Sequence, residues 1–228
     1  MSIGGVVTRH RAVVFVGLVV AGIAVLTYLT IASGRRGTKA VAPAGASTST
    51  VPGAAGELLG LVRRGQGSNI DIAYTGATPS PFTAHLWRRG PLARLDNETG
   101  SGNAAMASTQ LVTASGPVSC TRTGSAPWSC APKPGLKVGD LGVVSPALVN
   151  TLSGLDVKVH DERVLGQSVR CFTVADAATA TTVTAGGAQM CLTSDGIPVR
   201  VDAGPVHLEA VSLDRGRPAD SVFRPPGS

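Results

Sequence analysis

Hydrophobic and polar residues follow three different patterns along this chain. The first is an uncharged run of 22 residues from Ala12 to Ser33. As a helix it would be about 33 Å long, which matches the hydrocarbon core of a bilayer. It is also longer than the roughly 7 to 15 apolar residues usual in a cleaved signal peptide. We therefore predict a transmembrane helix over 12–33, preceded by a cytoplasmic tail over 1–11.

The second pattern, over 34–56, contains almost no large apolar side chains. Such a segment cannot offset the entropy of ordering by burial, so we predict a flexible linker there. The third pattern begins at Glu57 and fills one domain over 57–226. It opens with Leu58, Leu61 and Val62 at helical spacing, which predicts a short helix over 57–64.

Beyond that helix, apolar and polar residues alternate in short runs separated by Gly, Pro, Asn and Asp, which is typical of β-strands. Arg89-Gly90-Pro91 and Ser194-Asp195-Gly196 each lie between two such runs and predict hairpins. Pro146 and the apolar residues that follow it predict a short helix over 146–153. We predict strands over 69–75, 82–88, 92–97, 110–114, 118–121, 128–130, 155–164, 167–175, 188–192, 197–202 and 207–213.

The four cysteines, Cys120, Cys130, Cys171 and Cys191, all follow the apolar run. An even set at local spacings favours disulfides in an oxidising compartment. Of the three possible connectivities we predict the sequential one, because each pair encloses turn residues that can fold the chain back. A zinc site is the weaker interpretation, since no CxxC motif is present and the four histidines are scattered.

The charges around the apolar run do not decide its orientation. Arg9 and Arg11 precede it, whereas Arg35, Arg36 and Lys39 follow it, so the positive-inside count slightly opposes an outward C-terminus. The cysteines favour the opposite conclusion. We predict that the C-terminal domain lies outside the cell membrane; the alternative is a cytoplasmic domain with four reduced, buried thiols.

Sequence motifs for catalysis are missing. The chain has no GxSxG, P-loop, GxGxxG, HExxH or EF-hand pattern. His160-Asp161-Glu162 is the one tight group of titratable residues, and we interpret it as a solvated turn rather than as a general base. The net charge of +6 is modest and unclustered, which does not favour nucleic-acid binding. We predict a non-enzymatic protein without cofactor or bound metal.

The second half of the domain resembles a known family. The segments VLGQSVRCFTV, AQMCLTSDGIPVRV, HLEAVSL and DSVFRPP are similar to the end of LolA-like and LppX/LprG-like domains, which are extracytoplasmic carriers. Upstream, FTAHLWRRGPLARLDN resembles a hairpin of such proteins, and PVSCTRTGSAPWSC resembles a cysteine-bearing variant found in actinobacterial members. A bias toward Ala, Gly, Val and Thr, with Arg favoured over Lys, is typical of the same GC-rich bacteria.

The resemblance implies a mainly β fold with short helices (α+β), in which a strongly curved antiparallel sheet, a half-barrel, wraps around one or more helices. It implies a lipid or acyl-chain ligand in an apolar cavity. The candidate lining residues are Trp87, Trp128, Leu148, Val149 and Leu152, although ordinary core packing accounts for each of them. The alternative function is an envelope structural or signalling ectodomain that binds a protein partner and has no ligand cavity. The partners expected are thus the bilayer, a lipid or an envelope protein.

Overall fold

The computed structural model describes residues 53–78, 80–142, 157–174, 188–203 and 206–227, all within the second of two compact units, residues 50–228. The predicted transmembrane helix over 12–33, nearly all of the predicted linker and the predicted helix over 146–153 lie outside these ranges. Within them, no helix has the length and apolar character needed to cross a membrane.

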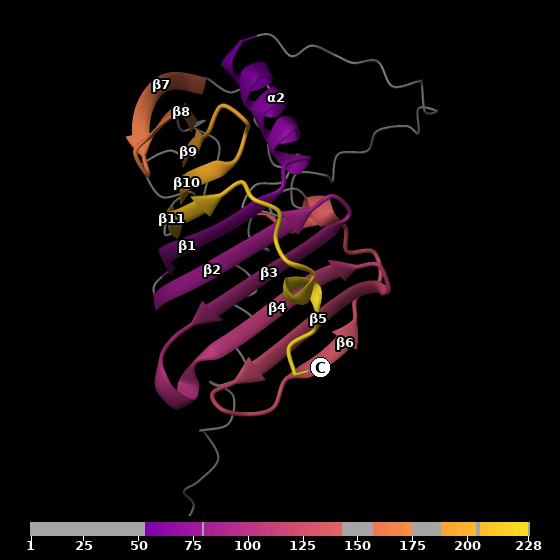
Figure 1. The fold of residues 1–228 in the computed structure, drawn as a ribbon. Helices are drawn as coiled ribbons and strands as arrows, with labels where there is room; N and C mark the ends of the chain where they lie inside the picture. Colours follow the sequence, from indigo (N-terminus) through magenta and orange to yellow (C-terminus); the bar gives the residue numbers. More distant parts are fainter. Residues whose placement is uncertain (1–52, 79, 143–156, 175–187, 204–205, 228) are drawn as a thin grey trace, which may run out of the picture. The chain divides into compact units, whose positions relative to one another are not determined.

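The described strands form one antiparallel sheet of eleven strands in the order β6-β5-β4-β3-β2-β1-β11-β10-β9-β8-β7 (Figure 1). It consists of two meanders, β1–β6 and β7–β11, which are joined where β1 pairs with β11. The strands are β1 Ile70–Thr78, β2 Ser80–Arg89, β3 Leu92–Thr99, β4 Met106–Thr113, β5 Gly116–Thr123, β6 Ser129–Pro132, β7 Val157–Val164, β8 Gln167–Val174, β9 Ala188–Leu192, β10 Pro198–Ala203 and β11 Val206–Asp214.

The predicted mainly β class and the antiparallel sheet are therefore confirmed, with β6 and β7 at the two edges of the described sheet. Both predicted hairpins are present: β2 turns into β3 at Gly90-Pro91, and β9 turns into β10 at 193–197. Short 3₁₀ turns η1 Gly102–Ala104, η2 Val138–Asp140 and η3 Asp220–Phe223 complete the described elements.

The alternation along the strands gives the sheet two different faces. Ile72 of β1 pairs with Leu86 of β2, and both side chains are buried on the same face. The next pair, Ala73 and His85, points to the opposite face because successive residues of a strand alternate. We call the side that carries Ile72 and Leu86 the helix face, and the side that carries His85 the polar face.

Helix α2, Ala54–Gln66, packs on the helix face. It begins three residues inside the predicted linker, which corrects that boundary. Its side chains Leu58, Leu59, Leu61 and Val62 form one buried cluster with Phe172, Met190 and Leu192 of β8 and β9. Full burial of an aliphatic or aromatic side chain of this size stabilises a fold by about 1.5–3 kcal/mol. The described space between α2 and the sheet is thus filled by the protein's own side chains.

Two polar groups of the helix face are buried but hydrogen-bonded. Arg88 is 6% exposed, and its guanidinium donates to the carbonyl oxygens of Ser68 (3.1 Å) and Gly65, at the C-terminal end of α2. Burial lowers the pKa of Arg88. The hydroxyl of Tyr74 donates to the carbonyl oxygen of Pro198 at 2.8 Å, and burial raises the pKa of this phenol. These bonds join β1 and β2 to α2 and to β10.

A close backbone approach fixes α2 against the turn between β9 and β10. Gly196 has a φ of +83°, and a Cβ there would overlap the carbonyl oxygen of Leu61. A Cβ at Gly65 would likewise overlap the carbonyl oxygen of Gly196. Glycine is therefore required on both sides of this contact.

Both predicted disulfides are present. Cys120–Cys130 joins β5 to β6, with 4.0 Å between the Cα atoms, and Cys171–Cys191 joins β8 to β9, with 3.9 Å. Cys130 lies on the exposed edge strand, whereas Cys171 and Cys191 are fully buried. One disulfide therefore cross-links the strands at one edge of the sheet, and the other cross-links two strands in a buried part of it.

Candidate binding face

One line of register partners crosses the polar face through ten strands. Opposed residues of an antiparallel pair point to the same face, so their side chains form a continuous row. From β7 to β11 the row holds His160, Cys171, Cys191, Arg200 and Glu209. From β1 to β5 it continues with Thr75, Thr83, Glu98, Ala107 and Arg122.

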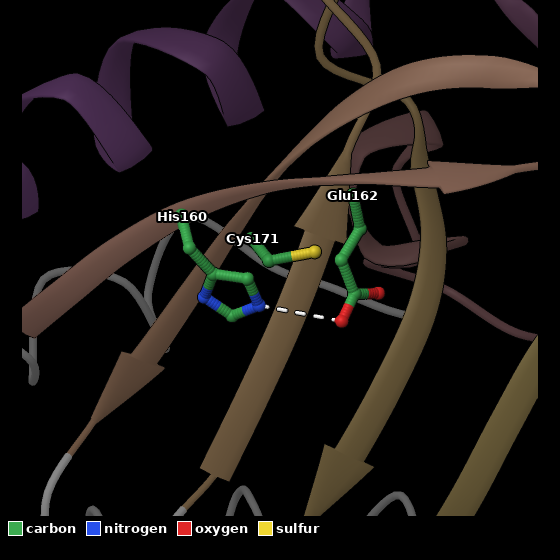
Figure 2. A group of neighbouring side chains, drawn as sticks. All are labelled: His160, Glu162 and Cys171. Carbon is green, nitrogen blue, oxygen red and sulfur yellow. Dashed lines mark hydrogen bonds and ion pairs between the residues drawn. The ribbon is translucent and has the colours of Figure 1, made fainter.

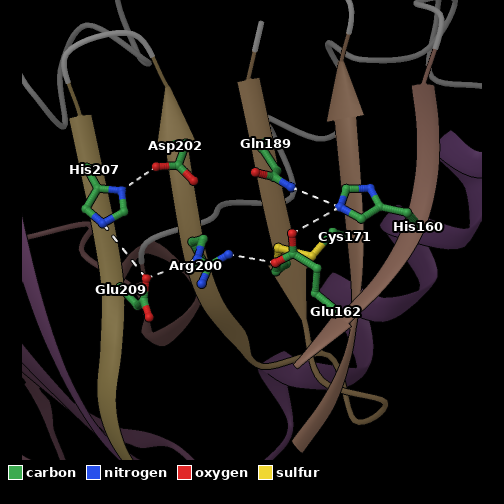
Figure 3. Close-up of polar contacts among 9 residues, drawn as sticks. His160, Glu162, Cys171, Gln189, Arg200, Asp202, His207 and Glu209 are labelled. Carbon is green, nitrogen blue, oxygen red and sulfur yellow. Dashed lines mark hydrogen bonds and ion pairs between the residues drawn. A yellow bond between two sulfur atoms is a disulfide. The ribbon is translucent and has the colours of Figure 1, made fainter. Parts of the chain in front are cut away.

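In the β7–β11 half, charged side chains of this face form a connected network (Figure 3). Arg200 donates to Glu162 at 2.6 Å and to Glu209 at 3.1 Å. The hydrogen bond with Glu209 is the main reason why the pKa of Arg200 is raised. His207 contacts Asp202 and lies 3.9 Å from Glu209. The charges of this network are therefore balanced by neighbours on the same strand, on an adjacent strand and, for Arg200 of β10 with Glu162 of β7, on a strand three places away in the sheet.

His160 and Glu162 do not lie in a turn, as the sequence interpretation had them. Both belong to strand β7, and they extend over the polar face, whereas Asp161 points the other way and pairs with Arg170 at 3.3 Å. The turn interpretation is wrong because the three polar residues continue the alternation of β7, where an edge strand exposes polar side chains on both faces.

His160, Glu162 and Cys171 come together beside the buried disulfide (Figure 2). Their nearest ligand-type atoms all lie within 4.8 Å of one another, and His160 Nε2 is 3.3 Å from Glu162 Oε1. This is the one such group among the residues that the structure describes. In the disulfide form, however, the sulfur of Cys171 is not a thiolate and does not ligate metal. Only an imidazole and a carboxylate are then available.

In the β1–β5 half, the polar face is hollowed. The hollow has a volume of about 370 Å³, which is at the lower end of the range for ligand sites. Both tryptophans of the chain, Trp87 and Trp128, line it. Its polar lining includes His85, Glu98, Thr109 and Arg122.

Side chains on the wall of the hollow are stacked. The Trp87 ring lies 3.6 Å from the ring of His85, and the guanidinium of Arg94 lies 5.5 Å from the Trp87 ring. His85 Nε2 is 2.5 Å from Asp71 Oδ1. Arg122 lies over the Trp128 ring at 4.9 Å. These contacts hold the two indoles in place without using the hydrogen-bonding capacity of Arg122.

Two buried polar atoms at the hollow make no hydrogen bond within the described protein: Thr109 Oγ1 and Arg122 Nε. Thr109 is fully buried and pairs with Cys120 across β4 and β5. An unsatisfied buried donor costs about 1–3 kcal/mol, so native proteins hold few of them. Glu98 on the same row also has no ion pair with a described residue.

The C-terminal segment covers the polar face next to the hollow. Arg94 Nη1 donates to the carbonyl oxygen of Val222 at 2.9 Å, and Arg89 contacts Asp220 and lies over the Phe223 ring at 5.1 Å. The ion pair with Arg89 lowers the pKa of Asp220. Turn η3 therefore lies at the boundary between the covered and the exposed parts of the polar face.

No protein-family model and no curated protein matches this chain. Solved structures with a similar fold include the following two. The first is an uncharacterised conserved protein from Thermus thermophilus, with a TM-score of 0.46 and 12% identity over 75% of this chain and 93% of that one. The second is MucB in complex with MucA(peri), with a TM-score of 0.47 and 15% identity over 76% of this chain and 60% of MucB.

The structure brings together two of the five predicted lining residues. Trp87 and Trp128 share one hollow, but it lies on the polar face and not between the sheet and α2. Leu148, Val149 and Leu152 lie outside the described residues. The sequence analysis missed Thr109 and Arg122, which become neighbours of the tryptophans only through the register of β2 to β5.

Proposed function

We propose that this chain is a membrane-tethered, non-enzymatic ectodomain that binds a protein partner through the hollow of its polar face. The observation that carries the proposal is the meeting of both tryptophans with two unpartnered buried polar atoms, Thr109 Oγ1 and Arg122 Nε. The membrane tether and the location outside the cytoplasm are taken from the sequence.

The composition of the hollow favours a protein as its occupant. Trp and Arg are the residue types that most often carry binding energy at protein interfaces, in pockets surrounded by a polar rim. Here Trp87, Trp128 and Arg122 lie at the hollow, and charged side chains surround them across the sheet. The partner segment is expected to bring an acceptor, a carboxylate or a backbone carbonyl, to the Nε–H of Arg122.

A lipid ligand was the first prediction from the sequence, and the described core does not favour it. Leu58, Phe172 and Leu192 are at most 1% exposed and pack on one another between α2 and the sheet. An acyl chain at that position would have to displace them. Binding of a lipid is therefore the alternative that the crosslinking experiment below must distinguish from a protein partner.

The test is site-specific photo-crosslinking of the full chain in intact cells. A photoreactive amino acid replaces Thr75, which is exposed at the hollow, or Arg63, which is on the exposed side of α2. We expect one defined protein adduct from position 75, none of that mass from position 63, and loss of the adduct when Trp128→Ala is added.

Affinity measurements with the identified partner then sharpen the proposal. Arg122→Gln should weaken binding by about 1.5–3 kcal/mol, which is the contribution of a hydrogen bond from a charged donor. Lys133→Gln, a matched loss of charge outside the hollow, should leave binding unchanged. Identical adducts from positions 75 and 63, or lipid adducts alone at position 75, would disprove a protein site at the hollow.

A further inference from the structure

The cluster beside the buried disulfide contains an imidazole, a carboxylate and, once the disulfide is reduced, two thiols, all of which are metal-ligand types. We propose that His160, Glu162, Cys171 and Cys191 form a site for a thiophilic divalent ion such as Zn²⁺ in the dithiol form of the protein. Metal binding and disulfide formation are then mutually exclusive states of the same cysteine pair.

The geometry already approaches that of a metal site. His160 is the register partner of Cys171, and Cys171 is that of Cys191, so three neighbouring strands bring their side chains to one place (Figure 3). Ligand atoms of His160, Glu162 and Cys171 lie within 4.8 Å of one another. In a tetrahedral zinc site the ligand atoms are about 3.6 Å apart, given bond lengths of about 2.0–2.3 Å. Closing this difference requires rotation of the His160 and Glu162 side chains, both of which are partly exposed.

The donor set and its surroundings suit zinc. Two thiolates, an imidazole and a carboxylate supply four ligands, and thiolates select soft ions over magnesium or calcium. Arg200 is the register partner of Cys191 and donates to Glu162, so it orients the carboxylate from outside the site. Its positive charge also balances the net charge of −1 that three anionic ligands and a divalent ion would have.

The two states are linked by a balanced exchange. Cys171 and Cys191 enter the fold as thiols, because the chain is synthesised before its disulfides form. Metal binding releases two protons from the thiols. Oxidation by a disulfide-bearing oxidant transfers two electrons from the metal-bound thiolates to that oxidant, whose S–S bond breaks and which takes up two protons from solvent and leaves as a dithiol; the Sγ–Sγ bond forms and the metal ion is released.

The other cysteine pair provides an internal control. Cys120 is the register partner of Thr109, and neither Cys120 nor Cys130 belongs to a group of three metal-binding side chains among the described residues. Reduction exposes two thiols there as well, but without an imidazole and a carboxylate beside them. The same reduced protein therefore contains one four-ligand site and one two-ligand pair.

The experiment is a titration of the full chain with Co²⁺, which reports thiolate ligation by its absorption bands, followed by displacement with Zn²⁺. The protein is reduced with a phosphine, and far-UV circular dichroism monitors the sheet. We expect one Co²⁺ per chain in the wild type and in Cys120→Ser/Cys130→Ser, and no thiolate bands in Cys171→Ser/Cys191→Ser. His160→Ala should weaken affinity at least 10-fold, and the oxidised wild type should show no thiolate bands.

Several results would overturn the site. One is retention of the bands in Cys171→Ser/Cys191→Ser; another is unchanged affinity in His160→Ala. If reduction alone melts the sheet, Zn²⁺ must restore the sheet signal in Cys120→Ser/Cys130→Ser. Failure to restore it there counts against the proposal as well.

Discussion

The two faces of the sheet arise from the same alternation of residues along the strands, but one buries mainly apolar side chains and the other carries most of the exposed ion pairs. On the helix face, Ile72, Leu86 and Phe172 are buried under α2 or among their neighbours, and the buried cation of Arg88 is hydrogen-bonded to backbone carbonyls. On the polar face, ion pairs such as Arg200–Glu162 remain partly exposed. Apolar burial stabilises far more than exposed ion pairs, which contribute about 0–1 kcal/mol each. The helix face therefore contributes most of the apolar burial, whereas the polar face combines the buried Cys171–Cys191 disulfide with exposed polar groups that are available for binding.

The contact between α2 and the β9–β10 turn should give the largest effect. Gly196→Ala places a methyl group against the carbonyl oxygen of Leu61 at a residue with φ of +83°, so α2 must move away from the sheet. We expect a loss of about 3–5 kcal/mol in the free energy of unfolding, measured by denaturant titration, from overpacking and backbone strain together.

Gly166→Ala is the matched control for this substitution. Gly166 has a similar φ of +71° in the β7–β8 turn, but no atom lies within 4 Å of the added methyl group. Only the backbone strain remains, and we expect a loss of about 1–2 kcal/mol. Equal losses at the two glycines would show that the α2 contact does not support the fold as described.

Substitution of one arginine on each face compares the two faces directly. Arg88→Met on the helix face removes the guanidinium that donates to the carbonyl oxygens of Gly65 and Ser68, and we expect a loss of about 2–3 kcal/mol. Arg200→Met on the polar face breaks two partly exposed ion pairs and should cost less than about 1 kcal/mol. Denaturant midpoints of both variants test this order, and a reversed order contradicts the assignment of the faces.

The smallest effect concerns the pH dependence of stability. Hydrogen bonds from Arg215 lower the pKa of Asp195 to about 2, from an ordinary value of 3.8. The stabilisation is present above the ordinary pKa and is lost as the pH falls from about 4 toward 2. Because the side chain of Asp195 is 36% exposed, we expect less than about 1 kcal/mol.

Arg215→Gln should remove most of this loss between pH 4 and pH 2. The free energy of unfolding of the variant and of the wild type, measured in steps of pH by denaturant titration, would then differ at pH 5 and converge near pH 2. Parallel curves over this range would exclude the pair as a source of acid sensitivity.

Much of the sheet was predictable because turn-forming residues mark the ends of its strands. Gly90-Pro91 and Asp195-Gly196 mark two hairpins, and the spacing of the cysteines indicated both disulfides. The start of α2 was missed because Ala54 and Ala55 were judged by their lack of large apolar side chains, although alanine has the strongest helix propensity.

The site was less predictable because it depends on register. Leu86 and Arg88 alternate with His85 and Trp87 in β2, so the sequence did contain a signal that Trp87 points away from the apolar core. Nothing local to β4 or β5 indicates that Thr109 and Arg122 lie near that indole. Alternation fixes the face of a side chain, whereas its neighbours on that face depend on strands that pair over long sequence distances.

The central position of the β1–β11 pair constrains the order in which the sheet is assembled. Within the first meander, strands β1 to β6 pair with their neighbours in sequence, so this meander can form before the rest of the chain has been synthesised. One edge of β1 then stays unpaired until β11, near the end of the chain, arrives. Open edges of this kind pair readily with other chains. A polypeptide that stalls or is cut before Val206 would expose its own middle strand as a template for aggregation.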